Sequence, residues 1–335
     1  MTDAWFIAQQ TLEIVIAVLS VLGNSLVLYV IKTHPPLQNI TNYLIASLAM
    51  ADLLVGLLGL PCVVINNFGL PYHFYGCLIM SSIIVVCTQI SIFSLLAIAI
   101  ERFLAIRLPI FHRRKFSRNA AGSIIAIAWV AGALVGFVPV FGWNDGPTKD
   151  NSCDFMEVID MSYMVYFNFF GFVLVPLLVI YATYGYIFYV VHSKLKAAEA
   201  AGNGSNARNF SFMENNQSGN TDLVKSRIRR EWQAVIRVLL IVVLFSVCWL
   251  PIHVMNSVYV FLQVSYGRAI TLGVLLSHAN SFLNPLLYAY TNVRFKEAFL
   301  KTLRLGSNSI RPNAYIADNS PEIENMDNEE SEAKY

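Results

Sequence analysis

Several polar and ionisable side chains lie inside segments that are otherwise apolar, where they could bind a ligand or an ion. In segment 270–290 these residues are Ser277, His278, Asn280 and Asn284. Charged groups are costly in hydrocarbon, about 2.5–3.5 kcal/mol for Arg, Lys or Asp at the centre of an inserting helix. Pro285 also removes a backbone donor, and polar neighbours or water must satisfy the group left behind. This segment is therefore expected to be a working part of a polytopic membrane protein and not a simple anchor.

Asp52 is the sole carboxylate deep in a second apolar segment, 41–66. At similar depths other segments carry Asn24, Ser91, Trp249, Asn280 and Asn284. An ionised carboxylate surrounded by hydroxyl and amide groups could hold a small cation such as sodium, together with water. A neutral Asp52 that hydrogen-bonds its neighbours and joins helices explains the pattern equally well.

A third set of polar residues falls in the outer halves of the apolar segments and could line a ligand cavity. The set comprises Glu13, Thr88, Gln89, Asn168, His253, Asn256, Ser277 and His278. His253 and Asn256 are three residues apart, so on a helix they face nearly the same way. Pro251 is expected to kink this helix near residue 247 and to swing its outer half. Hydrogen bonds between helices are the alternative role for these side chains.

Glu101 and Arg102 stand together at the inner end of the third apolar segment. An arginine at a helix end can extend its charge to the membrane interface, which is one interpretation of Arg102. The alternative is an ion pair with Glu231, at the inner start of the sixth segment. An ion pair between Arg102 and Glu231 would tie the inner ends of two helices and could act as a latch.

The sequence contains no arrangement typical of a catalytic or metal centre. It has no G-x-S-x-G, H-E-x-x-H, C-x-x-C or Walker A motif, and its histidines do not share metal-ligand spacing with acids. The net charge of +2 is too small to indicate a nucleic-acid partner. We therefore expect neither an enzyme nor a nucleic-acid-binding protein.

Composition and apolar length indicate the elements that position these residues. Hydrophobic residues make up 56% of the chain and charged residues 13%, against about 25% charged residues in soluble domains. Windows of about 20 mostly apolar residues, the length of a membrane span, occur seven times. They are residues 6–32, 41–66, 77–107, 120–142, 163–191, 236–262 and 270–290. The expected fold is an all-α bundle of seven transmembrane helices, the first of which is retained and not a signal peptide.

Lys and Arg gather in the loops after the third and fifth windows and beyond the seventh. Because cytoplasmic loops carry this excess, the N-terminus is expected outside the plasma membrane and the C-terminus inside. Residues 1–305 would form the membrane domain, ending in an amphipathic helix on the bilayer surface at 293–305. Residues 198–222 and 306–335 are polar and are expected to be disordered.

Cys77 opens the third window at its outer end, and Cys153 lies in an acidic outer loop. An oxidising compartment allows the two to pair, which would hold that loop over the mouth of the bundle. Two free thiols are the alternative.

Motifs in several windows resemble those of the rhodopsin-like (class A) G-protein-coupled receptors. They are Asn24, Asp52, Glu101-Arg102-Phe103, Trp249-Leu250-Pro251 and Asn284-Pro285-Leu286-Leu287-Tyr288. Other stretches resemble the adenosine receptors, namely residues 141–144, 164–170, 253–256 and 277–281. The resemblance implies a receptor for extracellular adenosine that modulates adenylate cyclase through a heterotrimeric G protein. Arrestin would be a further partner, and residues 277–290 lean toward receptors that lower cyclic AMP.

The resemblance also implies roles for single residues. Phe155 would stack on the purine, and Asn256 would make two hydrogen bonds to it. Thr88, Ser277 and His278 would meet the ribose, with Glu13 orienting His278. The remaining candidate pocket residues are Gln89, Met164, Asn168, Trp249, Ile252 and His253. The implied sodium site comprises Asp52, Ser91, Trp249, Asn280 and Asn284, and the implied switch Glu101, Arg102, Tyr184, Glu231, Pro251, Pro285 and Tyr288.

Three positions depart from the family pattern. Glu101 and Phe103 flank Arg102 where family members usually have aspartate and tyrosine, and Glu101 keeps the acid. Met156 follows Phe155 where they usually have glutamate. Since that glutamate bonds the exocyclic amine of adenine, Met156 leaves open a receptor for a different purine or a non-nucleoside ligand. A transporter or channel is a more remote alternative, and it predicts inverted repeats that the sequence does not show.

Overall fold

The computed structural model describes residues 4–148, 150, 152–203, 214–264 and 266–303. Seven helical stretches in it are long and apolar enough to cross a membrane. They are Ala4–Thr33, Ile40–Asn66, Phe74–Arg107, Arg118–Gly136, Tyr163–Lys194, Trp232–Leu262 and Arg268–Thr291. The predicted all-α bundle is therefore confirmed, and each predicted window overlaps one of these stretches, although the window 120–142 runs past the end of its helix at Gly136.

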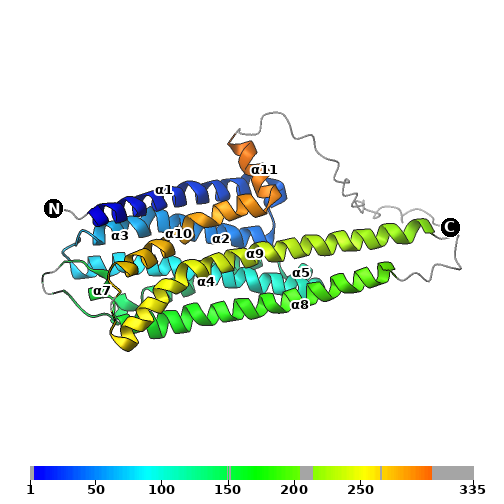
Figure 1. The fold of residues 1–335 in the computed structure, drawn as a ribbon. Helices are drawn as coiled ribbons and strands as arrows, with labels where there is room; N and C mark the ends of the chain where they lie inside the picture. The colour runs from blue at the N-terminus through cyan, green and yellow to red at the C-terminus, as the bar shows by residue number, and fades with distance from the viewer. Residues whose placement is uncertain (1–3, 149, 151, 204–213, 265, 304–335) are drawn as a thin grey trace, which may run out of the picture.

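The helices run along a common direction and form one elongated bundle (Figure 1). The first four stretches are formed by α1 (Ala4–Thr33), α2 (Ile40–Leu54) with α3 (Leu60–Asn66), α4 (Phe74–Arg107) and α6 (Arg118–Gly136). The other three comprise the π-helical Tyr163–Leu174 continuing into α8 (Val175–Asn203), then α9 (Glu214–Leu262) and α10 (Arg268–Thr291). Most of the apolar window of α4 is buried, 72% against 28% for α6, so α4 occupies the centre.

Two glycines allow α6 to pack closely on α4. A Cβ atom at Gly132 would lie 2.6 Å from the Ile90 side chain, and one at Gly136 would lie 2.6 Å from the Val86 backbone. Neither space holds a methyl group, so the small residues set the distance between these helices. This contact fixes the central helix, which carries several of the predicted site residues.

A short amphipathic helix, α11 (Val293–Thr302), follows the seventh span, as predicted. Its buried face consists of Phe295, Ala298 and Phe299, and the Phe295 ring lies 5.5 Å from that of Tyr288 on α10. Its basic residues Arg294, Lys296 and Lys301 are not buried. Helix α11 turns away from the axis of α10 at the end of the bundle opposite the start of α1 (Figure 1).

Helices α8 and α9 continue beyond the bundle at the same end as α11 (Figure 1). Helical backbone reaches Asn203 and resumes at Glu214, so it covers both flanks of the segment 198–222 that was expected to be disordered. Residues 204–213 and 304–335 lie outside the described residues. Disorder in the loop and in the tail 306–335, and the domain boundary at residue 305, stay predictions.

Candidate functional site

A buried acid–histidine pair joins α1 to α10 in the outer half of the bundle. Glu13 is fully buried and His278 is 5% exposed. The Nδ1 atom of His278 lies 2.9 and 3.0 Å from the two carboxylate oxygens of Glu13. Because a carboxylate only accepts, Nδ1 must carry the proton, and Nε2 is the ring nitrogen available to a ligand. The pair holds the imidazole in one orientation, and the role of this contact in ligand binding stays a prediction.

A second group of buried side chains has polar atoms that no part of the described chain satisfies. Gln89 on α4 has neither its amide oxygen nor its amide nitrogen hydrogen-bonded. The amide nitrogen of Asn168 and both ring nitrogens of His253 are in the same condition. Buried polar groups are nearly always paired in folded proteins, and each exception needs an explanation. Three of them on three neighbouring elements favour a site where a ligand or water supplies the missing partners.

His253 belongs to a stack of aromatic rings that runs down α9. The His253 ring lies parallel to that of Phe169 at 4.7 Å and is followed by Trp249 at 5.9 Å. Phe245 continues the stack, with its ring centre 6.0 Å from that of Trp249. The stack connects the outer polar group to the middle of the bundle next to Pro251, which lies inside α9. Its rings offer a flat, apolar wall beside the polar atoms.

The other predicted pocket residues lie in the same outer region. Met164, Ile252, Thr88, Asn256 and Ser277 are all buried. Two of them already use their hydroxyls locally, since Thr88 donates to Ile84 O and Ser277 donates to Val274 O. Thr88 and His278 line a small internal cavity between the helices. Asp52, Asn280 and Ser281 line the same cavity.

The outer loop is fixed over the bundle by a disulfide between Cys77 and Cys153. The predicted pairing is therefore confirmed. A short helix, α7 (Phe155–Val158), follows, with Asp154 Oδ1 accepting from Met156 N at 2.7 Å. Phe155 and Met156 are half-buried against the apolar cluster that contains Met164. Just before Cys153, hydrogen bonds from Ser152 to Asp150 lower the pKa of the Asp150 carboxyl and so favour its charged form.

Asp52 is buried in the middle of the bundle, where polar groups from three helices converge. Ser91 Oγ donates to Asp52 Oδ1 at 3.3 Å, and Asn284 Nδ2 donates to Oδ2 at 2.8 Å. The side-chain oxygens of Asn280 and Asn284 are buried with no hydrogen-bond donor within the described chain. A carboxylate with unpaired amide oxygens suits a hard cation, which prefers oxygen ligands. The donor set predicted from the sequence thus fits a small cation, and Trp249 borders the same cavity.

The described residues contain no group of three or more His, Cys, Asp or Glu placed to hold a metal ion. Asn24 supports the region structurally, since its amide donates to Ser20 O and to Ser281 O, both at 2.9 Å. It thereby joins α1 to α10 beside the candidate cation site.

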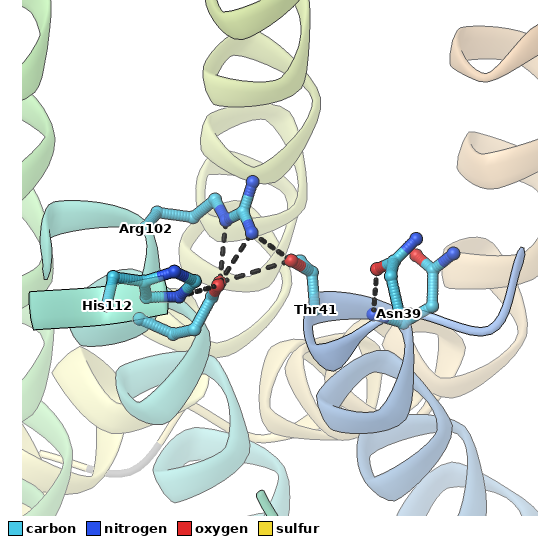
Figure 2. Close-up of polar contacts among 6 residues, drawn as sticks. Asn39, Thr41, Arg102 and His112 are labelled. Carbon is cyan, nitrogen blue, oxygen red and sulfur yellow. Dashed lines mark hydrogen bonds and ion pairs between the residues drawn. The ribbon is translucent and has the colours of Figure 1, made fainter. Parts of the chain in front are cut away.

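At the inner end of α4, Arg102 is held by its neighbour Glu101 (Figure 2). Its Nε and Nη2 atoms lie 2.6 and 2.7 Å from the two carboxylate oxygens of Glu101. Thr41 on α2 contacts both residues, and His112 of the loop helix α5 (Pro109–Lys115) lies 2.9 Å from Glu101 Oε1. Thr41 and His112 were not among the residues that the sequence indicated. The Glu231 side chain lies outside the described part, so the Arg102–Glu231 pair stays a prediction.

The two predicted switch tyrosines are buried near the inner end of the bundle. Tyr184 on α8 is 2% exposed and Tyr288 on α10 is 4% exposed. Neither hydroxyl has a hydrogen-bond partner within the described chain. Pro285 lies inside α10, one turn before Tyr288, where it interrupts the backbone hydrogen bonding. These hydroxyls are therefore free to take new partners if the helices rearrange.

Comparisons with known proteins agree with this architecture. Residues 23–288 match the family model described as "7 transmembrane receptor (rhodopsin family)". The chain is 37% identical to adenosine receptor A3 of Ovis aries over 300 residues, which cover 88% of this chain and 89% of the relative. It is 38% identical to adenosine receptor A2b of Homo sapiens over 323 residues, covering 90% of each. Adenosine receptor A2a of Homo sapiens is 38% identical over 311 residues, 88% of this chain and 71% of the relative. The chain therefore belongs to the rhodopsin family of seven-transmembrane receptors and, within it, to the adenosine receptors.

Proposed function

We propose that this receptor binds extracellular adenosine and activates a heterotrimeric G protein that modulates adenylate cyclase. The observation that carries the proposal is the group of buried, unsatisfied polar atoms on Gln89, Asn168 and His253. This group lies beside the Glu13–His278 pair in a chain whose relatives are adenosine receptors. A purine nucleoside suits such a site, because its base needs flat apolar walls and edge hydrogen bonds while its ribose needs hydroxyl partners.

Within this proposal the ligand roles follow the resemblance. Phe155, half-buried on the loop helix α7, stacks on the base. Asn256 matches the base edge with one donor and one acceptor, and His278 Nε2 meets the ribose with Ser277 and Thr88. Met164, Asn168, Ile252 and His253 line the pocket. The ligand pocket faces the outside of the cell, where the acidic loop lies. The basic inner ends of the helices face the cytoplasm, where the G protein and arrestin bind. Lipid surrounds the bundle.

Ligand binding would favour one of two arrangements of the bundle according to its affinity for each. The aromatic stack from His253 through Trp249 to Phe245 connects the pocket with the kink region near Pro251. At the inner end Arg102 leaves its carboxylate partners, and Tyr184 and Tyr288 use their free hydroxyls in new contacts. The arrangement in which Glu101 holds Arg102 is taken as the resting one, since the tethered guanidinium is not available to a cytoplasmic partner.

A cyclic AMP assay tests the proposal. Cells expressing the chain are expected to change their cyclic AMP level when titrated with adenosine after enzymatic removal of endogenous nucleoside. A fall is favoured over a rise by the sequence of segment 277–290. Untransfected cells and cells expressing Asn256→Ala serve as controls, because both should lack the response. A receptor that reaches the surface and gives no change in either direction would contradict adenosine as the ligand.

A receptor for a different purine is the second candidate, and Met156 favours it. The Met156 side chain packs against apolar residues, and the neighbouring Glu157 is exposed. Neither the thioether nor the exposed carboxylate replaces a carboxylate in the pocket beside Phe155. Competition binding with adenosine, inosine and adenine separates the candidates, because inosine lacks the exocyclic amine and adenine lacks the ribose. Preference for inosine or adenine over adenosine would support the second candidate.

The fit of the Asp52 site to a cation gives a separate prediction. Sodium bound at Asp52 would favour the resting arrangement, so by linkage sodium should weaken agonist binding. Asp52→Asn removes the charge but keeps the size, and agonist affinity in this variant is expected to be independent of sodium. The measurement is agonist affinity in sodium chloride against N-methylglucamine chloride at equal ionic strength. Glu297→Gln, at an exposed position of α11, should keep the sodium effect; a sodium effect that survives in Asp52→Asn would exclude this site.

A further inference from the structure

Asp160 lies directly before the fifth membrane span, and each of its carboxylate oxygens accepts one hydrogen bond. Oδ1 accepts from the backbone N–H of Ser162 at 2.6 Å, and Oδ2 accepts from the indole N–H of Trp143 at 3.0 Å. The first bond caps the start of the helical stretch, because a side-chain oxygen before a helix satisfies one of its free N–H groups. The second bond reaches the other limb of the outer loop. One side chain therefore connects the segment after the fourth span to the beginning of the fifth.

The Trp143 ring packs on the first turns of the fifth span. Its centre lies 5.9 Å from that of Tyr163 and 5.7 Å from that of Phe167, both on the π-helical segment of the span. Tyr163 is fully buried, and its hydroxyl donates to Val135 O of α6 at 2.9 Å. Aromatic pairs tolerate a range of geometries, whereas a hydrogen bond requires a direction. The ring packing thus brings the two segments together, and the N–H bond to Asp160 fixes how they are aligned.

The two limbs of the outer loop are joined beside this contact. Asp145 N donates to Val158 O at 3.3 Å, and Val158 and Ile159 are both buried. The segment between the disulfide at Cys153 and Asp160 contains α7, which lies at the end of the bundle where α1 begins (Figure 1). This segment is therefore held at one end by the disulfide and at the other by Asp160.

The fifth span continues from Asp160 into the wall of the candidate pocket. Met164 N donates to Asp160 O at 3.2 Å, and Met164 and Asn168 are both buried on the segment that follows. The Asn168 amide nitrogen is one of the buried polar atoms without a partner in the described chain. A bound ligand can use such a nitrogen only when the helix that carries it has the matching position and rotation. The alignment of the first turns of this helix therefore affects the pocket directly.

We propose that Asp160 is a positioning residue for the ligand pocket and that it acts through Trp143. Asp160 does not need to touch the ligand, because both of its oxygens already have donors. Its bond to Trp143 fixes the alignment of the fifth span with the outer loop, and so the place from which Met164 and Asn168 reach the ligand. Positioning of this kind preorganises a site, which reduces the ordering that binding would otherwise require. The effect on adenosine affinity rests on the proposed function.

Loss of negative charge from the loop is the competing explanation for any effect of replacing Asp160. The loop also contains Asp150, whose Oδ1 accepts from Ser152 N at 3.1 Å in the same kind of turn. Asparagine in place of Asp150 removes one charge and keeps the acceptor oxygen, in a stretch without tryptophan. Adenosine carries no charge at neutral pH, so the field of the loop does not steer it. Asp150→Asn is therefore the matched control.

The test measures hydrogen–deuterium exchange by mass spectrometry on ligand-free receptor in lipid nanodiscs. In Asp160→Asn the amide can accept from Ser162 N, but its NH2 group then faces the indole N–H, so two donors meet and the Trp143 bond is lost. Trp143→Phe keeps an aromatic ring and removes the donor. Peptides covering residues 160–168 are expected to exchange about tenfold faster in either variant. Asp160→Asn should add no further increase in the Trp143→Phe background, because the bond is already absent.

Asp150→Asn should leave exchange in these peptides unchanged, and peptides from α10 serve as an internal reference in every sample. Faster exchange in α10 as well would indicate general destabilisation and would overturn the inference. Unchanged exchange at 160–168 in Asp160→Asn, or an independent further increase in the double variant, would overturn it too.

Adenosine binding to the same discs measures the consequence for the pocket. Affinity should fall by about tenfold in Asp160→Asn and in Trp143→Phe, by no more in the double variant, and not at all in Asp150→Asn. Faster exchange at 160–168 with unchanged adenosine affinity would overturn the positioning role. If the unmodified receptor binds no adenosine while the exchange differences persist, the proposed ligand is wrong and the alignment of the fifth span by Asp160 is supported.

Discussion

Replacing Glu13 by glutamine is expected to weaken adenosine binding by roughly 10–100-fold, because the buried His278 loses its charged acceptor. The two carboxylate oxygens of Glu13 lie 2.9 and 3.0 Å from His278 Nδ1, and the acid is fully buried. An amide offers a single acceptor oxygen and no charge. The amide can accept from a protonated Nδ1 or donate to a bare one, so it no longer fixes which ring nitrogen carries the proton and which is presented to the pocket. Equilibrium binding of radiolabelled adenosine to membranes measures the effect.

A double-mutant cycle separates this coupling from a general loss of folded receptor. Glu13→Gln, His278→Gln and the double variant should be non-additive, since removing either partner abolishes the same interaction. Glu297→Gln on the exposed face of α11 changes the same functional group elsewhere and should bind normally. Additive losses in the cycle, or normal affinity in Glu13→Gln, would contradict a positioning role for Glu13.

The fold was predictable because its main signal is composition over long windows. Seven apolar windows of sufficient length became seven spans, and the basic–aromatic pattern after the last became α11. Polar residues inside those windows were informative for the same reason: Asp52, Asn280 and Asn284 needed partners in hydrocarbon, and the structure places them together. Depth in the membrane, read from position along each window, was enough to bring these three residues into one layer.

The contacts around Arg102 were not predictable in this way. Arg102 was expected to pair with Glu231, because both residues were placed at the inner ends of their helices and so at similar depth in the membrane. The structure shows Arg102 held by the adjacent Glu101, with Thr41 and His112 around the pair, and the Glu231 side chain lies outside the described residues. His112 lies in a loop, where depth in the membrane carries no information, and only the path of α5 brings it back to α4. The π-helical segment Tyr163–Leu174 likewise has no signature in its apolar composition.

Replacing Cys153 by serine is expected to remove the outer loop from the mouth of the bundle and to destabilise the receptor by about 2–5 kcal/mol. The Cys77–Cys153 disulfide joins residues 76 positions apart, so its loss frees a long loop in the unfolded chain. In the folded receptor Cys153 N donates to Gly69 O, and Phe155 and Met156 follow directly in α7. A single backbone hydrogen bond and one short helix should not hold this end of the loop alone. Ligand affinity should therefore fall together with unfolding temperature.

The matched control is Cys62→Ser, which removes a half-buried free thiol on α3 and leaves the disulfide intact. Cys77→Ser, Cys153→Ser and the double variant should share one phenotype, because each abolishes the same bond. Thermal unfolding and adenosine binding of purified receptor measure both consequences. If the disulfide acts on the bundle alone, the three variants would lower the unfolding temperature but bind adenosine normally below it. A parallel loss of affinity would instead show that the bond acts on the ligand site, because the disulfide sets the position from which Phe155 reaches the purine.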